Sequence, residues 1–163
     1  MYIYLSPIPL FPLPMKIEDE IQQAAFRNDH QKAHVNLIFT TNWLQQQQSS
    51  YFKQFGLTLP QFNILRILRG QHPRPATVNL LIERMLDKTS NASRIVDKLE
   101  TKQLVTRCVC PSNRRAVDIR ISEEGLALLG RLDVVMADQQ FGVQNLTLAE
   151  AAELSNLLDK IRD

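Results

Sequence analysis

Residues 77–121 constrain the fold of this chain most strongly, because the spacing of their apolar side chains changes partway along. Up to residue 101 the apolar residues recur at the spacing of an α-helix, and beyond residue 104 they alternate as in a strand. Thr77 can cap a first helix, which is expected to end near Met85. The pattern predicts a short helix, a tight turn, a second helix and then two strands.

The second helix of this region has one apolar and one polar face. A buried stripe is predicted by four residues at helical spacing: Ala92, Ile95, Val96 and Leu99. The opposite face carries Ser90, Arg94, Asp97 and Thr101, flanked by Asn91, Ser93 and Lys98. A face that reads the edges of DNA bases needs amide, hydroxyl and guanidinium groups near the helix N-terminus, and this face has them there.

Two strands are predicted after the helix, over residues 104–109 and 116–121. The second alternates apolar and polar side chains, as in a half-buried strand. Residues 110–115 are expected to form the turn between them, since Pro, Ser and Asn are turn formers. Arg114 and Arg115 in that turn suit a phosphate backbone or a minor groove. Two helices followed by a basic hairpin predict a winged helix-turn-helix DNA-binding domain over residues 56–122.

Basic residues are concentrated in the same region. Residues 84–115 hold eight Lys or Arg and three acidic residues, whereas the rest of the 163-residue chain holds eleven and fourteen. The segment therefore carries +5 and the remainder −3, which together give the overall charge of +2. A basic segment within a nearly neutral chain is the electrostatic footprint of a DNA-binding surface.

Helices are predicted on both sides of this domain. Residues 16–55 contain no proline or glycine and predict one long helix, either whole or broken near Asn28-Asp29 or in the glutamine run 45–48. Gly56 is expected to end it. With only 5 glycines in the chain, long periodic runs of this kind favour a mainly α fold.

On the C-terminal side, Ser122 is expected to cap a helix that runs to about Phe141 and ends at Gly142. Thr147 and Glu150 form a capping box for a last helix, whose apolar stripe is Leu154, Leu157, Leu158 and Ile161. Because these apolar faces lie outside the DNA-binding domain, residues 16–55 and 123–163 predict a helical dimerisation module. A two-fold dimer would present two recognition helices about 34 Å apart to a pseudo-palindromic operator.

Residues 1–15 form a proline-rich N-terminal arm that is expected to be extended or disordered. The first 14 residues are apolar, uncharged and contain four prolines. They lack the basic region and cleavage site of a signal peptide and are too short to span a bilayer. Two interpretations remain open: an over-extended start site, or an arm that packs on a partner subunit. The two cysteines, two positions apart on one strand, are unsuited to a disulfide and indicate a cytoplasmic protein.

The chain resembles the MarR (multiple antibiotic resistance regulator) family over roughly residues 16–161. The resemblance rests on four blocks in order: LTLPQFNIL at 57–65, SNASRIVDKLETK at 90–102, NRRAV at 113–117 and ISEEG at 121–125. Each block alone is a moderate signal, and their order and spacing together make a strong one. The resemblance implies a homodimeric, mostly helical transcription regulator, often a repressor that a small ligand, such as an aromatic or phenolic effector, releases from DNA.

The resemblance also implies roles for individual residues. Four side chains would approach base edges: Ser90, Asn91, Ser93 and Arg94. Lys88 and Lys98 would meet phosphates, and Arg115 or Arg114 would enter the minor groove. Two positions depart from the family pattern. Asn113 stands where the family has an Asp that orients the wing arginine, and Gln103 stands where it has a Gly, so a positive φ there would be strained.

Other features favour no second activity. Cys108 and Cys110 raise the alternative of a redox-sensing regulator, with Arg107 nearby to favour a thiolate. His30 and His34 share a helix face, but the sequence places no further ligands, so neither a metal nor another cofactor is expected. Aromatic side chains of the first long helix could line an effector pocket: Phe26, Phe39 and Trp43. No catalytic grouping is evident, so the competing class is a winged-helix protein-interaction module without DNA affinity.

Overall fold

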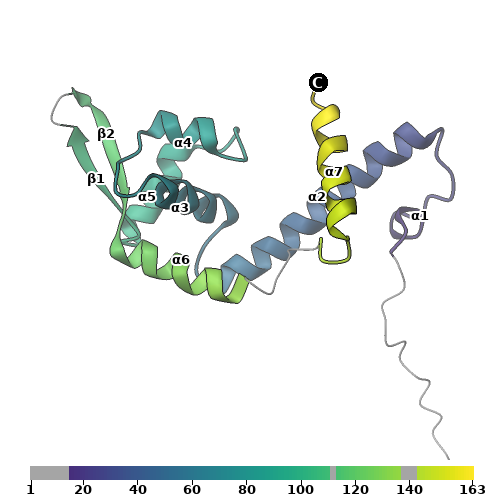
Figure 1. The fold of residues 1–163 in the computed structure, drawn as a ribbon, viewed down its shortest axis with the longest axis horizontal. Helices are drawn as coiled ribbons and strands as arrows, with labels where there is room; N and C mark the ends of the chain where they lie inside the picture. Colours follow the sequence, from purple (N-terminus) through teal and green to yellow (C-terminus); the bar gives the residue numbers. More distant parts are fainter. Residues whose placement is uncertain (1–14, 111–112, 137–142) are drawn as a thin grey trace, which may run out of the picture. The chain divides into compact units, whose positions relative to one another are not determined.

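The computed structural model describes residues 15–110, 113–136 and 143–163, with the side chains of 109, 110 and 113–116 excepted. Its elements are α1 (Ile17–Glu20), α2 (Asp29–Lys53), α3 (Leu59–Gln71), α4 (Val78–Arg84), α5 (Ala92–Thr101), β1 (Val105–Cys110), β2 (Asn113–Ile121), α6 (Glu123–Met136) and α7 (Leu148–Lys160) (Figure 1). These elements confirm the predicted mainly α fold with a two-stranded β hairpin. The chain divides into two compact units, residues 1–45 and 46–163.

The first unit holds α1 and most of α2. The Asn28 Oδ1 atom accepts a hydrogen bond from the backbone N–H of Gln31 (2.9 Å) and so satisfies a free donor at the start of α2. The long helix is therefore broken before Asp29, one of the two predicted places. The glutamine run 45–48 lies inside α2 and breaks nothing.

In the second unit, α3, α4, α5 and the hairpin enclose one apolar core. The predicted stripe of α5 is confirmed, because Ala92, Val96 and Leu99 are buried. They belong to one cluster with buried residues of α3, α4, β2 and α6, among them Ile64, Leu65, Leu68, Leu81, Ile119, Leu129 and Leu132. This core holds α5 by its apolar face, and the residues of the opposite face are exposed in the described part of the chain.

Four predicted helix starts are confirmed by their caps. Thr58 with Gln61, and Thr147 with Glu150, form capping boxes at α3 and α7. Thr77 accepts a hydrogen bond from the Leu80 N–H at α4. The Ser122 hydroxyl accepts one from the Gly125 N–H (3.0 Å) at α6. The predicted end of α6, at Phe141 and Gly142, lies outside the described residues.

Two helices end in the same backbone motif. After α2, the Leu57 N–H donates to Phe52 O and the Gly56 N–H to Lys53 O; after α5, the same bonds join Leu104 to Leu99 and Gln103 to Glu100. This Schellman motif requires a left-handed residue at the position after the cap. Gly56 (φ 67°) fills it in the first case and Gln103 (φ 60°) in the second. The positive φ at Gln103, which the sequence analysis names as the condition for strain, is thus present.

Lys102 joins the end of α5 to the start of α3. Its Nζ atom donates to Gly56 O (2.5 Å) and to the side-chain oxygen of Gln61 (3.1 Å). Gln61 is the one polar residue buried in the described part of the chain, and the same oxygen accepts from the Thr58 N–H. The ammonium therefore satisfies a buried acceptor and a helix-terminal carbonyl together.

The sheet is an antiparallel β1–β2 hairpin, paired from Val105↔Ile121 to Cys110↔Asn113 with an irregularity at Val109/Cys110. Ala76 adds a bridge to Ile119, through two backbone hydrogen bonds of 2.9 and 2.8 Å. The prediction of a turn over residues 110–115 was wrong in its length. Residues 113–115 belong to β2, and Asn113 pairs with Cys110 across the irregularity, so the strand begins before the apolar alternation does.

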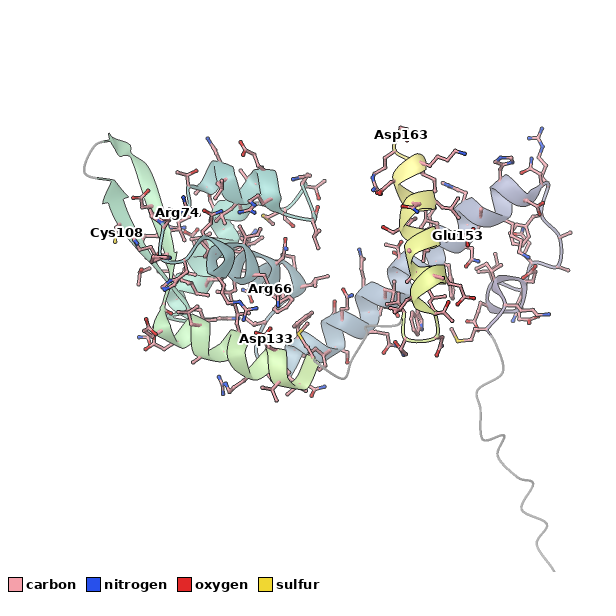
Figure 2. The ribbon with its side chains drawn as sticks, viewed as in Figure 1. Arg66, Arg74, Cys108, Asp133, Glu153 and Asp163 are labelled. Carbon is pink, nitrogen blue, oxygen red and sulfur yellow. The ribbon has the colours of Figure 1, made fainter. Side chains whose placement is uncertain are left out.

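The helix that follows the hairpin is fastened to α3 by charge. Asp133 of α6 accepts hydrogen bonds from Arg66 (3.1 Å) and from both terminal nitrogens of Arg69 on α3 (Figure 2). The bonds from Arg69, and then the nearby positive charges, hold the pKa of Asp133 below its usual value. The clamp fixes α6 against the element that packs beneath α5.

Candidate nucleic-acid interface

The polar face of α5 is open to solvent, as predicted. Arg94, Asp97, Lys98 and Thr101 are exposed, opposite the buried stripe. The helix begins at Ala92, however, so Ser90, which was assigned to this face from its spacing, lies before the helix. The Asn91 side chain accepts a hydrogen bond from the Arg94 N–H (3.0 Å) and is the N-cap, and Ser90 lies in the preceding turn. Ser90 and Asn91 are polar like the exposed face of α5, so the sequence pattern does not show where the helix begins.

The turn between α4 and α5 is organised by Asp87. Its carboxylate accepts hydrogen bonds from the Thr89 N–H (2.9 Å), the Thr89 hydroxyl (2.6 Å) and the Ser90 hydroxyl (2.6 Å). The side-chain bonds, that from Ser90 first, lower the pKa of Asp87 to about 2. Asp87 was absent from the predicted site, although an Asp followed by Thr and Ser is a sequence signal for such a turn.

The cations predicted to meet DNA differ in their surroundings. Arg94 and Lys98 are exposed, and within the described part of the chain their charged groups have no hydrogen bond or ion pair. Lys88 instead donates its Nζ protons to Ile82 O (3.2 Å) and Glu83 O, and so caps the C-terminal end of α4. Its phosphate contact stays a prediction.

Arg107 of β1 crosses onto α5, a contact that the sequence did not indicate. Its Nη2 atom lies 2.5 Å from an Asp97 carboxylate oxygen and donates to Ser93 O (3.2 Å). Its Nε atom lies 3.6 Å from Glu100, which makes a longer ion pair. One guanidinium thus spans two turns of α5 and offsets the two acids that would otherwise repel phosphates. It also joins the base of the hairpin to the helix.

The tip of the hairpin carries the remaining predicted residues. The backbone of Arg114 and Arg115 is on β2, and their side chains, like that of Asn113, lie outside the described atoms; their DNA contacts stay predictions. Cys108 is exposed with a free thiol (Figure 2). Arg107, its neighbour in sequence, is bound to Asp97 and Ser93 of α5, and the redox-sensing alternative stays a prediction.

Two further features of the described residues concern metal ions and membranes. His30 and His34 are exposed on α2, and the described residues contain no group of three or more His, Cys, Asp or Glu that could hold a metal ion. None of the helices in those same ranges is long and apolar enough to cross a membrane.

Two helices joined by a tight turn, a packed hairpin and an open polar face on the second helix define a winged helix-turn-helix protein. The sequence of this domain also matches a known protein family. Residues 55–116 match the MarR family model. Over this segment the chain is similar to transcription regulators of the MarR family.

Individual transcription regulators are also similar to this chain. The chain is 27% identical to the HTH-type transcriptional regulator MhqR of Bacillus subtilis over 63% of its own length and 57% of that protein's. It is 25% identical to the HTH-type transcriptional regulator MgrA of Staphylococcus aureus, over 82% and 92%. The crystal structure of a MarR transcription factor from Planctomyces limnophilus is similar, with a TM-score of 0.63, 29% identity and coverage of 85% and 98%.

Proposed function

We propose that this chain is a cytoplasmic, homodimeric regulator that binds a pseudo-palindromic operator and represses a nearby operon. The observation that carries the proposal is the open polar face of α5, with its buried opposite face and its unpaired Arg94 and Lys98. A helix held in this way can enter a major groove with its N-terminal residues toward the base edges. Ser90, Asn91, Ser93 and Arg94 would contact bases, Lys88 and Lys98 phosphates, and Arg114 or Arg115 the minor groove.

Binding should depend steeply on salt, since each phosphate contact releases counterions. The experiment titrates the protein against a duplex from its own upstream region and against a random duplex at several salt concentrations. Absence of binding to any duplex would favour a winged-helix module that contacts only proteins.

Arg94→Ala tests the base contact. If Arg94 reads a base, the substitution should weaken operator binding by about 1–3 kcal/mol and leave random-duplex binding much less affected. Arg131→Ala, an exposed arginine of α6, is the matched control. Equal losses on both duplexes would make Arg94 a phosphate contact only.

The proposed dimer interface uses residues 16–55 and 123–163, outside the 56–122 DNA-binding domain. None of the residues of α7 is buried, and Leu154, Leu157 and Ile161 are 41%, 52% and 68% exposed. On α2, Leu37 and Ile38 are 38% and 50% exposed. Each helix thus exposes apolar side chains that a protein partner could cover, and the proposal takes a second copy of the chain as that partner.

Deleting residues 148–163 should convert a species of twice 18.7 kDa into a monomer in sedimentation analysis. Leu157→Glu should do the same without shortening the chain, whereas Ser155→Glu, with the same charge on the polar side of α7, should not. A dimer that persists in both the deletion and Leu157→Glu would move the interface elsewhere.

The proposal includes release from DNA by a small aromatic or phenolic effector. Phe26, Phe39 and Trp43 are half-buried in the first part of the chain and offer aromatic contacts. Trp43 is the single tryptophan of the sequence, so its fluorescence reports binding nearby. Phenol and benzoate should quench it and lower operator affinity together; quenching without any change in DNA affinity would remove the effector step.

A further inference from the structure

The acceptor oxygen of the Asn91 side chain is already used in the cap of α5. Its Oδ1 atom accepts the Arg94 N–H at 3.0 Å, and because that donor is a backbone group, the accepting atom must be the oxygen. The amide nitrogen, with two protons, is the part of the side chain left for DNA. The paired contact of an asparagine with adenine needs both atoms, one accepting from N6 and one donating to N7. Asn91 could make it only with the oxygen that already caps α5, which would have to accept the N6 proton as a second hydrogen bond in the position that the cap fixes.

The carboxylates along the same face are also engaged by internal donors. Asp87 accepts from Thr89 and Ser90 in the turn, and Asp97 is bound by Arg107 from the hairpin. A carboxylate on a recognition helix is the usual acceptor for the amino group of cytosine. Here each of these carboxylates is tied to a group of its own chain, so the face has few acceptors to offer.

The donors of the face are free. The Arg94 guanidinium and the Lys98 ammonium have no partner within the described residues. The Ser93 hydroxyl, which can donate or accept, is exposed beside them. The Ser90 hydroxyl is the exception, because its proton goes to Asp87 and only its oxygen lone pair remains.

We infer that Asn91 and Arg94 form a donor-only reading edge, selective for the N7 and O6 atoms of guanine and the O4 atom of thymine in the major groove. The inference rests on the proposed function and deepens it, since it specifies which base atoms the recognition helix seeks. Adenine is contacted through N7 alone, and the amino groups of adenine and cytosine are not read by these two side chains.

The first test uses modified operators. Duplexes are selected from a random pool by the wild-type protein, and each half-site guanine is then replaced by 7-deazaguanine, which removes N7 and keeps base pairing. At one or more positions per half-site the affinity should fall at least about fivefold, the lower range for a paired base contact. Replacing each adenine by purine, which lacks the N6 amino group, should cost less than about twofold.

The second test uses Asn91→Asp. Aspartate caps a helix as well as asparagine does, so the thermal midpoint should stay close to that of the wild type. The variant lacks the donors, and operator affinity should fall about tenfold more than random-duplex affinity. Asn145→Asp, an exposed position before α7, adds the same charge away from α5 and should change both affinities alike.

The outcomes separate this inference from the proposed function. A wild-type protein that selects no sequence from the pool overturns both. A protein that selects an operator, yet tolerates 7-deazaguanine at every position or loses as much with purine, overturns the donor-only edge alone. Equal losses of operator and random-duplex affinity in Asn91→Asp would also overturn it.

Discussion

Gln103→Gly is expected to stabilise the protein, although it removes a side chain. Gln103 occupies the left-handed position after α5, where an L residue with a Cβ is strained. The backbone there cannot relax, since the Gln103 N–H bonds to Glu100 O and Gln103 O accepts from the Ser122 hydroxyl (2.7 Å). The strain is therefore held in the folded state and is released only on unfolding.

Two opposing effects set the size of this change. A left-handed conformation costs an L residue about 1–2 kcal/mol, which glycine avoids. Glycine in turn loses about 0.5–1 kcal/mol more through the greater freedom of the unfolded chain. The difference predicts a gain of about 0.5–1 kcal/mol in the free energy of unfolding. For a chain of this length that is a rise of about 1–4 °C in Tm.

The measurement is urea unfolding followed by circular dichroism, with Tm from a thermal scan. Gln103→Ala is the control, because alanine removes the side chain and keeps the strain; it should not be stabilised. Gly56→Ala is the reverse change in the same motif, and since the new Cβ would meet no atom within 4 Å, it should lose a similar amount. Stabilisation by Gln103→Ala equal to that by glycine would refute the reasoning.

Three further predictions follow from the site and its supports. Gly125→Ala places a Cβ 2.3 Å from Leu104 O and should cost about 1–3 kcal/mol, whereas Gly130→Ala meets nothing and should gain about 0.5–1 kcal/mol; urea midpoints that shift in the same direction would contradict this. Because the pKa of Asp87 falls from 3.8 to about 2, the stabilisation from its turn is complete above about 3.8 and is lost as the pH falls toward 2. Carboxyl NMR, with Asp87→Asn to assign the signal, checks this, and a titration midpoint near 3.8 would count against it. Arg107→Met should lower duplex affinity severalfold in fluorescence anisotropy by leaving two carboxylates unpaired beside the DNA, and adding Asp97→Asn should recover part of the loss; no recovery would exclude the electrostatic cause.

The parts of the fold that were predicted correctly depend on local rules. The buried stripe of α5 follows from helical periodicity, and the starts of α3, α4, α6 and α7 follow from hydroxyl caps within four residues of their partners. The motif after α5 was also foreseen as a strained one at Gln103, because a helix end of that kind demands a left-handed residue whichever residue the sequence supplies.

The parts that were missed depend on contacts between distant residues or on how a polar group is used. Nothing in the order of residues shows that Arg107 reaches α5, since the contact depends on how the hairpin packs. Likewise, Lys88 was predicted to contact a phosphate, whereas in the structure its ammonium group donates to a carbonyl at the C-terminal end of α4. Ser90 was assigned to the polar face of α5, although the helix begins after it. The reason is that Asn91 continues the polar pattern while its side chain caps the helix.

The contact of Lys102 with Gly56 and Gln61 has a consequence for how α5 is held. The ammonium holds the last carbonyl after α2 and the reading helix at one point, and it lies outside the apolar core of the domain. Phe52 of α2 and Leu57 after it are buried in the same core as the apolar face of α5, so the two segments are joined through apolar contacts as well as through the lysine. Loss of the lysine would leave the apolar contacts in place and remove one hydrogen bond from Gly56 O and one from the buried side-chain oxygen of Gln61.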